Sequence, residues 1–254
     1  ATLQISDARV YAHTPKSYKN YLLHVPFLLR CLALVLVILV LARPQTTNKW
    51  QNSEIEGIDI MLAIDVSTSM LAEDLKPNRL EAAKDVAAEF INGRPNDNIG
   101  ITLFAGETFT QCPLTVDHAV LLDMIHNIKC GLITDGTAVG MGIANAVTRL
   151  KDSKAKSKVI ILLTDGTNNK GDISPMTAAE IAKSFGIRVY TIGVGTNGMA
   201  PYPYPVGNTV QYVSMPVEID EKTLTEIAGT TDGNYFRATS NSKLKEVYEE
   251  IDKL

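Results

Sequence analysis

The sequence has few cysteines and histidines, and this scarcity excludes several kinds of site. Three cysteines occur among 254 residues, and neither they nor the four histidines show the spacing of a zinc site. A disulfide-dense scaffold is excluded for the same reason. Two interpretations of Cys112 and Cys130 stay open, because they fit either two small buried residues or, in an oxidising compartment, a bridged pair.

An excess of positive charge is also lacking. The chain carries 24 Lys and Arg against 28 Asp and Glu, a formal net charge of -4, so its overall field does not favour nucleic acid. Hydrophobic residues make up 45% of the chain, enough for a sizeable core, which excludes intrinsic disorder. Because the chain starts at Ala1 without a methionine, we expect terminal segments of the natural protein to be missing.

One long apolar run stands near the N-terminus. Cys31–Ala42 is apolar throughout, and Tyr21–Leu29 extends it to the length that spans a bilayer. Arg30 opposes insertion by about 3 kcal/mol, but roughly a dozen Leu, Val, Ile and Phe offset it at about -0.3 to -0.6 kcal/mol each. A buried core helix and a signal peptide are the alternatives, but no A-x-A cleavage pattern follows. We therefore expect a transmembrane helix over residues 21–43.

Positive residues on the two sides of this segment predict its orientation. Four stand on the N-terminal side and two beyond it: Arg9, Lys16, Lys19 and Arg30, then Arg43 and Lys49. Because positive flanks stay inside, residues 1–20 should be a cytoplasmic juxtamembrane segment and everything after Arg43 should lie outside. Residues 44–56 then form a linker to the globular part.

From Gly57 onward, short β-branched runs alternate with segments of helical period. This alternation predicts an α/β fold with a mostly parallel central sheet flanked by helices. Continuous apolar runs such as Val159–Leu163 are expected for strands covered on both faces. The predicted strands are Ile58–Asp65, Ile99–Ala105, Val159–Thr164, Val189–Val194 and Tyr235–Ala238, with Thr108–Gln111 as an edge strand.

Helical stripes and capping residues fill the intervals between these strands. Asp117 is predicted to cap one helix and Ser174-Pro175 to open another that ends at Gly186. The apolar stripes predicted to be buried are Leu80, Ala83, Val86, Ala87, Phe90 and Ile91; Val120, Leu121, Met124, Ile125 and Ile128; Met141, Ala144, Val147 and Leu150; and Ile181, Ala182 and Phe185. Two more helices are predicted near Glu221–Ala228 and Ser242–Leu254.

A stretch rich in proline, tyrosine and glycine interrupts this pattern. Met199–Val217 contains Gly207-Asn208 between apolar flanks, the signal of a tight hairpin turn. We therefore expect a hairpin inserted at the surface.

Oxygen-bearing side chains follow the strands at their carboxyl ends, where α/β sheets collect ligands. The first strand ends in a carboxylate followed by two hydroxyls, and later loops add a third hydroxyl and a second carboxylate. Hard oxygen donors without sulfur suit Mg²⁺, with Mn²⁺ and Ca²⁺ as alternatives. The predicted metal ligands are Asp65, Ser67, Ser69, Thr137 and Asp165, the last followed by Gly166 at a sharp turn.

The predicted site is incomplete by itself. We expect the three hydroxyls to bind the ion directly or through water, and Asp165 to act mainly through groups bound to the ion. At least one coordination position should then stay open for an acidic side chain from a protein partner. No base or nucleophile stands beside these residues, so we predict no catalytic residue and no enzyme activity.

On these residues the chain resembles the von Willebrand factor A (VWA) domain and its metal-ion-dependent adhesion site (MIDAS). The matching pattern is Asp65-x-Ser67-x-Ser69, Thr137 and Asp165-Gly166, and the resemblance covers 57–254. More narrowly, the segments LARPQ, GIDIMLAIDVSTSM, NRLEAAK and DGTAVGMGI resemble the bacterial aerotolerance BatA family.

The resemblance implies a Rossmann-like domain with a metal site and a place in a bacterial membrane complex. It implies partners as well, namely other Bat proteins and a MoxR-type AAA+ ATPase, and a link to stress or oxygen tolerance. Combined with the charge bias around the apolar segment, it implies the inner membrane with the domain in the periplasm.

Two alternatives to a metal-dependent protein-binding module stay open. Mg²⁺-dependent phosphatases of the haloacid dehalogenase type also place Asp at the end of a first parallel strand, but they need a second Asp where this chain has Ser67. A surface adhesin would use the same residues toward another cell. The short linker favours a partner in the same membrane.

Overall fold

The computed structural model of the protein describes residues 22, 24–42, 57–165, 167–206, 209–217, 219–240 and 242. They belong to two compact units, 1–53 and 54–254, which are taken separately below. Several predicted features lie outside the described residues: the segment 1–20, the linker 44–56, Gly166, the turn Gly207-Asn208 and, apart from Ser242, the helix Ser242–Leu254.

The N-terminal unit contains one helix that could cross a membrane. This helix, α2 (Val25–Ala42), has 18 residues with a mean hydropathy of 2.8, and none of them is buried by the protein. At about 1.5 Å per residue it is close to the thickness of a hydrocarbon core. Arg30 lies within its first two turns, near the end where a long side chain can reach the headgroups. By length and composition, the described part of the predicted segment 21–43 can span a bilayer.

The second unit is built around a six-stranded sheet of order β3-β2-β1-β4-β5-β8. All neighbouring pairs are parallel except β2 and β3, which are antiparallel, so the predicted edge strand lies at the edge. The strands are β1 (Asp59–Asp65), β2 (Asn98–Phe104), β3 (Thr108–Thr115), β4 (Lys158–Thr164), β5 (Ile187–Val194) and β8 (Tyr235–Ala238). The mostly parallel sheet expected from the sequence is confirmed.

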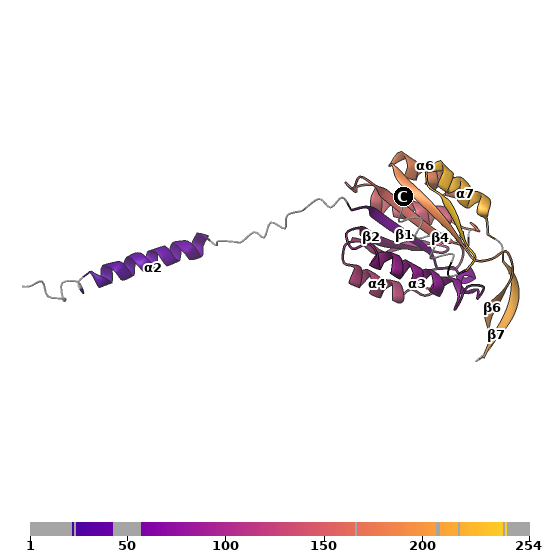
Figure 1. Ribbon diagram of the computed structural model, residues 1–254, viewed down its shortest axis with the longest axis horizontal. Helices are drawn as coiled ribbons and strands as arrows, with labels where there is room; N and C mark the ends of the chain where they lie inside the picture. Colours follow the sequence, from indigo (N-terminus) through magenta and orange to yellow (C-terminus); the bar gives the residue numbers. More distant parts are fainter. Residues whose placement is uncertain are drawn as a thin grey trace, which may run out of the picture. The chain divides into compact units, whose positions relative to one another are not determined.

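Helices cover both faces of this sheet (Figure 1). The helices are α3 (Arg79–Asn92) and α4 (His118–His126) on one face, and α5 (Val139–Leu150), α6 (Pro175–Ser184) and α7 (Glu221–Thr230) on the other. In β1, Ile60, Leu62 and Ile64 belong to the first core, and Met61 and Ala63 to the second. Burial on both faces explains why the central strands are continuously apolar.

The helix ends follow the sequence signals. The Asp117 side chain accepts a hydrogen bond from the Val120 N–H, and Ser174 caps α6 with Pro175 in its first turn. Gly186 follows α6 with a φ of 66°, the left-handed geometry predicted for a helix-ending residue.

Two residues of the predicted buried stripes are exposed, so these two predictions are wrong. The exposed fraction is 44% for Val120 and 42% for Phe185. In α4 the buried residues are Leu121 and Ile125, and Val120 stands beside that stripe. Phe185 is the C-cap of α6, so it has left the helical geometry that buries Ala182.

A separate two-stranded hairpin consists of β6 (Gly198–Val206) and β7 (Thr209–Val217). The strands pair antiparallel from Gly198↔Val217 to Val206↔Thr209, which confirms the predicted hairpin. Figure 1 shows the hairpin as a ribbon that extends from the domain beside the six-stranded sheet.

Two helical glycines should respond oppositely to alanine. A Cβ on Gly140 of α5 would overlap the backbone of Ile173, whereas nothing lies within 4 Å of a Cβ on Gly229 of α7. Helix propensity alone favours Ala over Gly by about 1 kcal/mol. We therefore expect Gly229→Ala to stabilise the fold by about 0.5 to 1 kcal/mol and Gly140→Ala to destabilise it by about 1 to 3 kcal/mol. Urea denaturation measures both, and stabilisation by Gly140→Ala would contradict the packing argument.

Candidate metal centre

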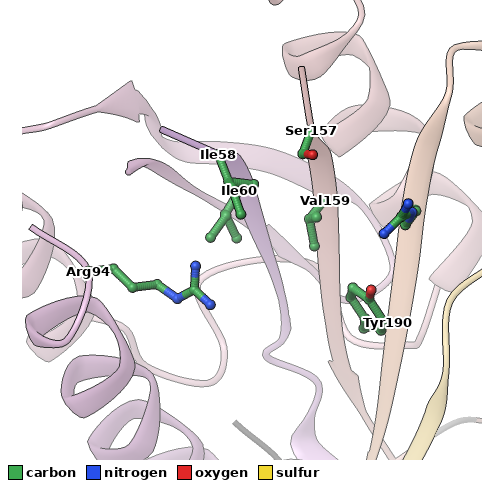
Figure 2. Close-up of a pocket in the computed structure, with 7 residues that line it drawn as sticks. Ile58, Ile60, Arg94, Ser157, Val159 and Tyr190 are labelled. Atoms are coloured by element: carbon green, nitrogen blue, oxygen red, sulfur yellow. The ribbon is translucent and has the colours of Figure 1, made fainter. Parts of the chain in front are cut away.

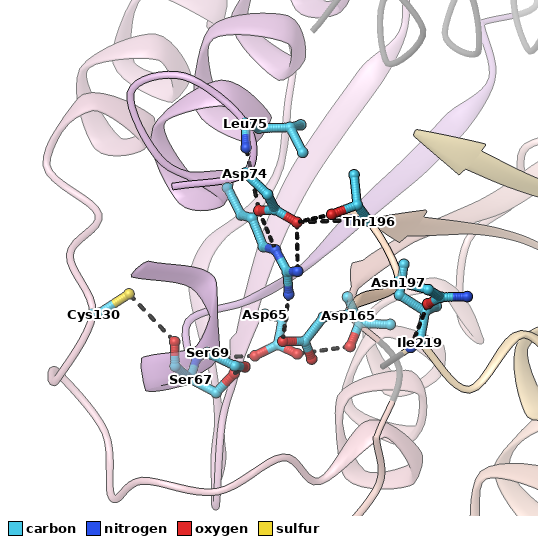
Figure 3. Close-up of polar contacts among 12 residues, drawn as sticks. Asp65, Ser67, Ser69, Asp74, Leu75, Cys130, Asp165, Thr196, Asn197 and Ile219 are labelled. Carbon is cyan, nitrogen blue, oxygen red and sulfur yellow. Dashed lines mark hydrogen bonds and ion pairs between the residues drawn. The ribbon is translucent and has the colours of Figure 1, made fainter. Parts of the chain in front are cut away.

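The loop after β1 places a carboxylate and two hydroxyls in one tight turn. Asp65 is the last residue of β1, and its Oδ1 accepts a hydrogen bond of 2.9 Å from the Ser67 N–H. Ser67 then stands at the N-cap position of the short helix η2 (Thr68–Leu71), without a capping hydrogen bond from its side chain, and η2 carries Ser69. The Oγ atoms of Ser67 and Ser69 lie 2.9 Å apart (Figure 3). The D-x-S-x-S spacing therefore brings its three oxygen-bearing groups to the same side of the loop.

The second predicted carboxylate joins the same cluster. Thr164 ends β4, the strand beside β1, and its hydroxyl donates to Asp65 Oδ2 at 2.7 Å. Asp165 follows immediately and shares a hydrogen bond with the Ser69 hydroxyl. Figure 3 shows Asp65, Ser67, Ser69 and Asp165 gathered at this edge of the sheet. Four of the five predicted ligands therefore meet.

Thr137 lies in the loop before α5. This loop is hydrogen-bonded both to the loop after β1 and to the loop after β4. Asp135 accepts hydrogen bonds from the Thr68 N–H at 3.1 Å and the Thr68 hydroxyl at 3.0 Å. The Thr137 N–H donates to Asn169 Oδ1 at 2.9 Å, in the loop that begins at Asp165. Thr137 is buried there. Among the described residues, its hydroxyl makes no hydrogen bond to the other four side chains, so its role as a ligand stays a prediction.

Burial shapes the charge of this cluster. Asp65 is fully buried, and Asp165 is 5% exposed. Burial and the nearby charge of Asp165 raise the pKa of Asp65 to about 7, despite hydrogen bonds from Ser67 and Thr164. Burial also raises the pKa of Asp165, against the opposing effects of Ser69 and Arg79. Two carboxylates held in this way are stabilised in their ionised form by a bound cation.

Sequence reasoning missed a buried arginine behind the cluster. Arg79 is 1% exposed, and its Nη1 lies 3.2 Å from Asp165 Oδ2. Its Nε and Nη2 donate to the two oxygens of Asp74 at 2.7 and 2.6 Å. Burial alone would raise the pKa of Asp74, but hydrogen bonds from Arg79 and the Thr196 N–H lower it. Arg79 stands in the NRLEAAK segment, but no spacing rule indicates its partners.

The donor set fits a divalent cation. The cluster and the ion pair behind it together hold three carboxylates, Asp65, Asp165 and Asp74, against the single guanidinium of Arg79, a net charge of two negatives when all are ionised. These three carboxylates do not converge on one point, and the described residues contain no group of three His, Cys, Asp or Glu side chains placed to hold a metal. A site here would therefore combine carboxylates with hydroxyls and waters, as Mg²⁺ prefers.

The two cysteines of the domain are free thiols in this structure. Cys112 is buried and Cys130 is partly buried. The Cys130 thiol donates to the Ser67 carbonyl over 3.4 Å. Burial, with the negative charge of Asp65, raises the pKa of this thiol to about 12. Of the two interpretations, the structure shows unbridged cysteines.

A small cavity lies toward the amino ends of the sheet strands, away from the carboxyl ends that carry the cluster (Figure 2). Its volume of about 40 Å³ has room for only a few water molecules. It is lined by residues from the first halves of β1, β4 and β5 or just before them, together with Arg94 from the loop after α3: Ile58, Ile60, Ser157, Val159, Arg188 and Tyr190. It is therefore separate from the carboxylate cluster.

These features define an α/β domain with carboxylates and hydroxyls converging at the carboxyl edge of its sheet. The profile of the von Willebrand factor type A domain matches residues 59–250. The chain therefore belongs to the VWA domain family.

Sequence relatives match beyond the domain. A UPF0353 protein of Nocardia farcinica is 30% identical over 98% of this chain and 78% of its own length. An uncharacterised protein of Borreliella burgdorferi is 29% identical over 87% of this chain and 66% of its own length. The chain thus spans about two thirds to four fifths of these relatives.

Solved structures include one protein named for aerotolerance and one named BatB. An aerotolerance-related membrane protein of Bacteroides fragilis is 34% identical with a TM-score of 0.68, covering 78% of this chain and 100% of that one. BatB of Bacteroides thetaiotaomicron is 33% identical with a TM-score of 0.69, covering 78% and 98%. The resemblance to the aerotolerance proteins is confirmed.

A further solved structure bears on the metal. Proximal thread matrix protein 1 of the mussel byssus, described with a zinc-occupied MIDAS motif, is 25% identical with a TM-score of 0.61. It covers 78% of this chain and 45% of that one. A divalent metal is thus bound by a relative of this fold.

Asp65 should make the metal-free protein less stable as the pH rises. Its pKa of about 7 in the folded state exceeds the ordinary 3.8. Between pH 3.8 and pH 7 the folded state therefore binds more protons than the unfolded state, and it loses stability as the pH rises and Asp65 ionises. We expect Asp65→Asn in EDTA to raise Tm at pH 8 by about 4 °C or more over the native chain, with a smaller gain at pH 5. Thermal denaturation at both pH values measures this, and equal gains would contradict it.

Proposed function

We propose that the protein is a membrane-anchored, divalent-metal-dependent protein-binding module without catalytic activity. The observation that carries this function is the buried cluster of Asp65, Asp165, Ser67 and Ser69, whose charge and oxygen donors fit one divalent ion. Such a cluster supplies only part of an octahedral shell. The open part accepts a carboxylate from a partner protein.

Mg²⁺ is the proposed ion, with Mn²⁺ and Ca²⁺ as the alternatives among hard cations. Asp65, Ser67, Ser69 and Thr137 would hold it directly or through water. Asp165 would accept hydrogen bonds from groups bound to the ion, since its carboxylate already contacts Ser69 and Arg79. The bound ion supplies the charge that attracts the partner's acidic side chain.

The proposed setting is a multiprotein membrane complex linked to stress or oxygen tolerance. The proposed partners are other Bat proteins and a MoxR-type AAA+ ATPase. The names of two solved relatives, an aerotolerance-related membrane protein and BatB, support the complex and its link to oxygen. The ATPase rests on the family resemblance alone.

The proposed location is the bacterial inner membrane, with the domain in the periplasm. Helix α2 supplies the membrane anchor. The orientation follows from the four positive residues on its N-terminal side against two beyond it.

Metal binding should depend more on Asp65 than on any single hydroxyl. We expect Asp65→Asn to weaken Mg²⁺ binding by about 100-fold or more, because it removes a charged ligand, and Ser67→Ala to weaken it by about tenfold. Asp85→Asn, on the exposed side of α3, is the matched control and should change nothing. Isothermal titration of Mg²⁺ into the full chain in detergent measures the affinities. Equal binding by Asp65→Asn and the native chain would remove the metal site.

The orientation of the domain can be tested with protease. If the domain lies in the periplasm, trypsin added to spheroplasts should digest the domain while a cytoplasmic control protein survives. Inverted membrane vesicles should protect it. Digestion in inverted vesicles and protection in spheroplasts would place the domain in the cytoplasm instead.

A further inference from the structure

The five parallel strands of the sheet begin at one edge of the domain and end at the other, which carries the metal centre. The amino edge consists of the first two residues of these strands, the loops before them and the last four residues of α3, α5, α6 and α7. Residues 116–117 also belong to it, because the last residue of the antiparallel β3, Thr115, pairs with Ile99 at the start of β2. The amino edge is therefore the side of the domain away from Asp65.

The amino edge is basic although the domain as a whole is acidic. Residues 57–254 carry 18 Lys and Arg against 25 Asp and Glu. The charged residues of the amino edge are Arg94, Arg149, Lys151, Lys154, Lys156, Lys158, Lys183 and Arg188, with Asp59, Glu89, Asp97, Asp117, Asp152 and Asp232. The amino edge thus holds eight of the 18 basic residues and six of the 25 acidic ones, which leaves 10 against 19 for the rest of the domain.

Most of this positive charge comes from the loop between α5 and β4. Residues 151–158 read KDSKAKSK, with four lysines to one aspartate. Three of these lysines are exposed to water: Lys151, Lys154 and Lys156. Two acidic residues of the edge oppose them little, because Asp59 is buried and Asp97 pairs with Arg94 at 2.7 Å. A cluster of lysines therefore faces water on the side away from the metal centre.

Apolar side chains are exposed among these charges. Phe185 stands between Lys183 and Arg188 at the turn from α6 to β5, and it is 42% exposed. Val116, directly after β3, is 62% exposed, and Val120, in the first turn of α4, is 44% exposed. Basic residues around exposed apolar side chains are typical of protein surfaces that lie among lipid head groups. The amino edge has this composition.

The chain itself enters the domain at the amino edge. The Ile58 N–H donates to Asp97 Oδ1 at 2.9 Å, and the Asp59 N–H donates to the Ser157 carbonyl at 3.2 Å. Fourteen residues, 43–56, follow α2 before this point, and a chain of that length reaches about 50 Å at most. A bilayer that holds α2 is therefore within reach of the domain, but the length of the linker alone allows either edge to face it.

We propose that the amino edge rests on anionic lipid head groups of the membrane that holds α2. Its lysines pair with the lipid phosphates, and Phe185 enters the boundary between head groups and acyl chains. The same surface repels the acidic remainder of the domain, so attraction and repulsion turn the domain in the same direction. The metal centre then faces away from the bilayer, toward a partner protein. This inference rests on the membrane anchor of the proposed function and is independent of the metal.

Two other occupants would use the same positive charge, namely an acidic protein and the acidic carboxyl edge of a second copy. The bilayer is favoured because the chain tethers it to the side of the domain that carries the lysines. An exposed phenylalanine also adds nothing to a purely ionic contact, whereas it gains contact with acyl chains in a bilayer.

A photoreactive probe in place of Phe185 tests which surface this edge meets. The full chain with benzophenone-alanine at position 185 is placed in lipid nanodiscs, one copy per disc. The discs contain phosphatidylcholine alone or mixed with an equal part of phosphatidylglycerol. Leu132, which is 55% exposed in the loop between α4 and α5, is the matched probe position on the carboxyl side. Irradiation followed by mass spectrometry measures the fraction of the chain joined to lipid.

The lysines are tested by variants that change only exposed side chains and should keep the Tm of the native chain. The first combines three changes at the amino edge: Lys151→Gln, Lys154→Gln and Lys156→Gln. The second removes the same charge on the carboxyl side: Lys76→Gln, Lys129→Gln and Lys222→Gln. The third keeps the charge of the amino edge: Lys151→Arg, Lys154→Arg and Lys156→Arg.

We expect the lipid adduct at position 185 in anionic discs to exceed, by at least about tenfold, both the adduct at position 132 and the adduct in neutral discs. The three glutamines at the amino edge should lower it at least about fivefold, whereas the other two variants should leave it within about twofold. Equal adducts at both positions, equal adducts in both kinds of disc, an equal loss in the two glutamine variants, or no adduct would each overturn the inference.

The same probe in the membranes of the producing cells separates the alternatives. A lipid adduct at position 185 supports the inference, whereas an adduct with an acidic protein or a second copy in its place overturns it. A chain that does not enter the discs would refute the proposed anchor and this inference with it. The Mg²⁺ titration of Asp65→Asn tests the metal-dependent function alone, so the two failures are distinguishable.

Discussion

The structure depends on placing two carboxylates at the ends of adjacent buried strands. Asp65 ends β1, and Asp165 follows β4, so the sheet itself brings both into a region that excludes water. Burial of charge on this scale is unfavourable unless opposite charge is present. Arg79 supplies one positive charge from within the chain but shares it with Asp74, and burial together with the charge of Asp165 raises the pKa of Asp65 to about 7. In the proposed function, a bound divalent cation supplies the remaining positive charge.

Much of the fold could be read from the sequence because the central strands and the caps carry strong local signals. Continuous apolar runs marked the strands buried on both faces, and Asp117 and Ser174 marked helix starts. The two wrong predictions concern Val120, which lies beside the buried stripe of α4, and Phe185, which lies at the end of α6. Periodicity gives the buried side only to within about one residue.

The candidate site likewise contains residues that the sequence predicts and residues that it does not. Asp65, Ser67 and Ser69 lie within five residues and share one turn, so their convergence follows from local geometry. Asp165 could be added because parallel strands share a carboxyl edge. Arg79 and Asp74 could not, since their contacts depend on how α3 docks beneath that edge and on the loop at Thr196. Ion pairs that depend on tertiary packing cannot be predicted from the spacing of residues in the sequence.

Gly195 shows how closely the loop after β5 fits this arrangement. Its φ is 125°, and a Cβ there would lie 2.5 Å from the Arg79 guanidinium. The Arg79 side chain thus fills the space that a side chain at position 195 would need, although 116 positions, 195 minus 79, separate the two residues in the sequence. In descent, two constraints act on position 195: the positive φ favours glycine in every lineage, and the arginine adds a steric barrier wherever it is kept.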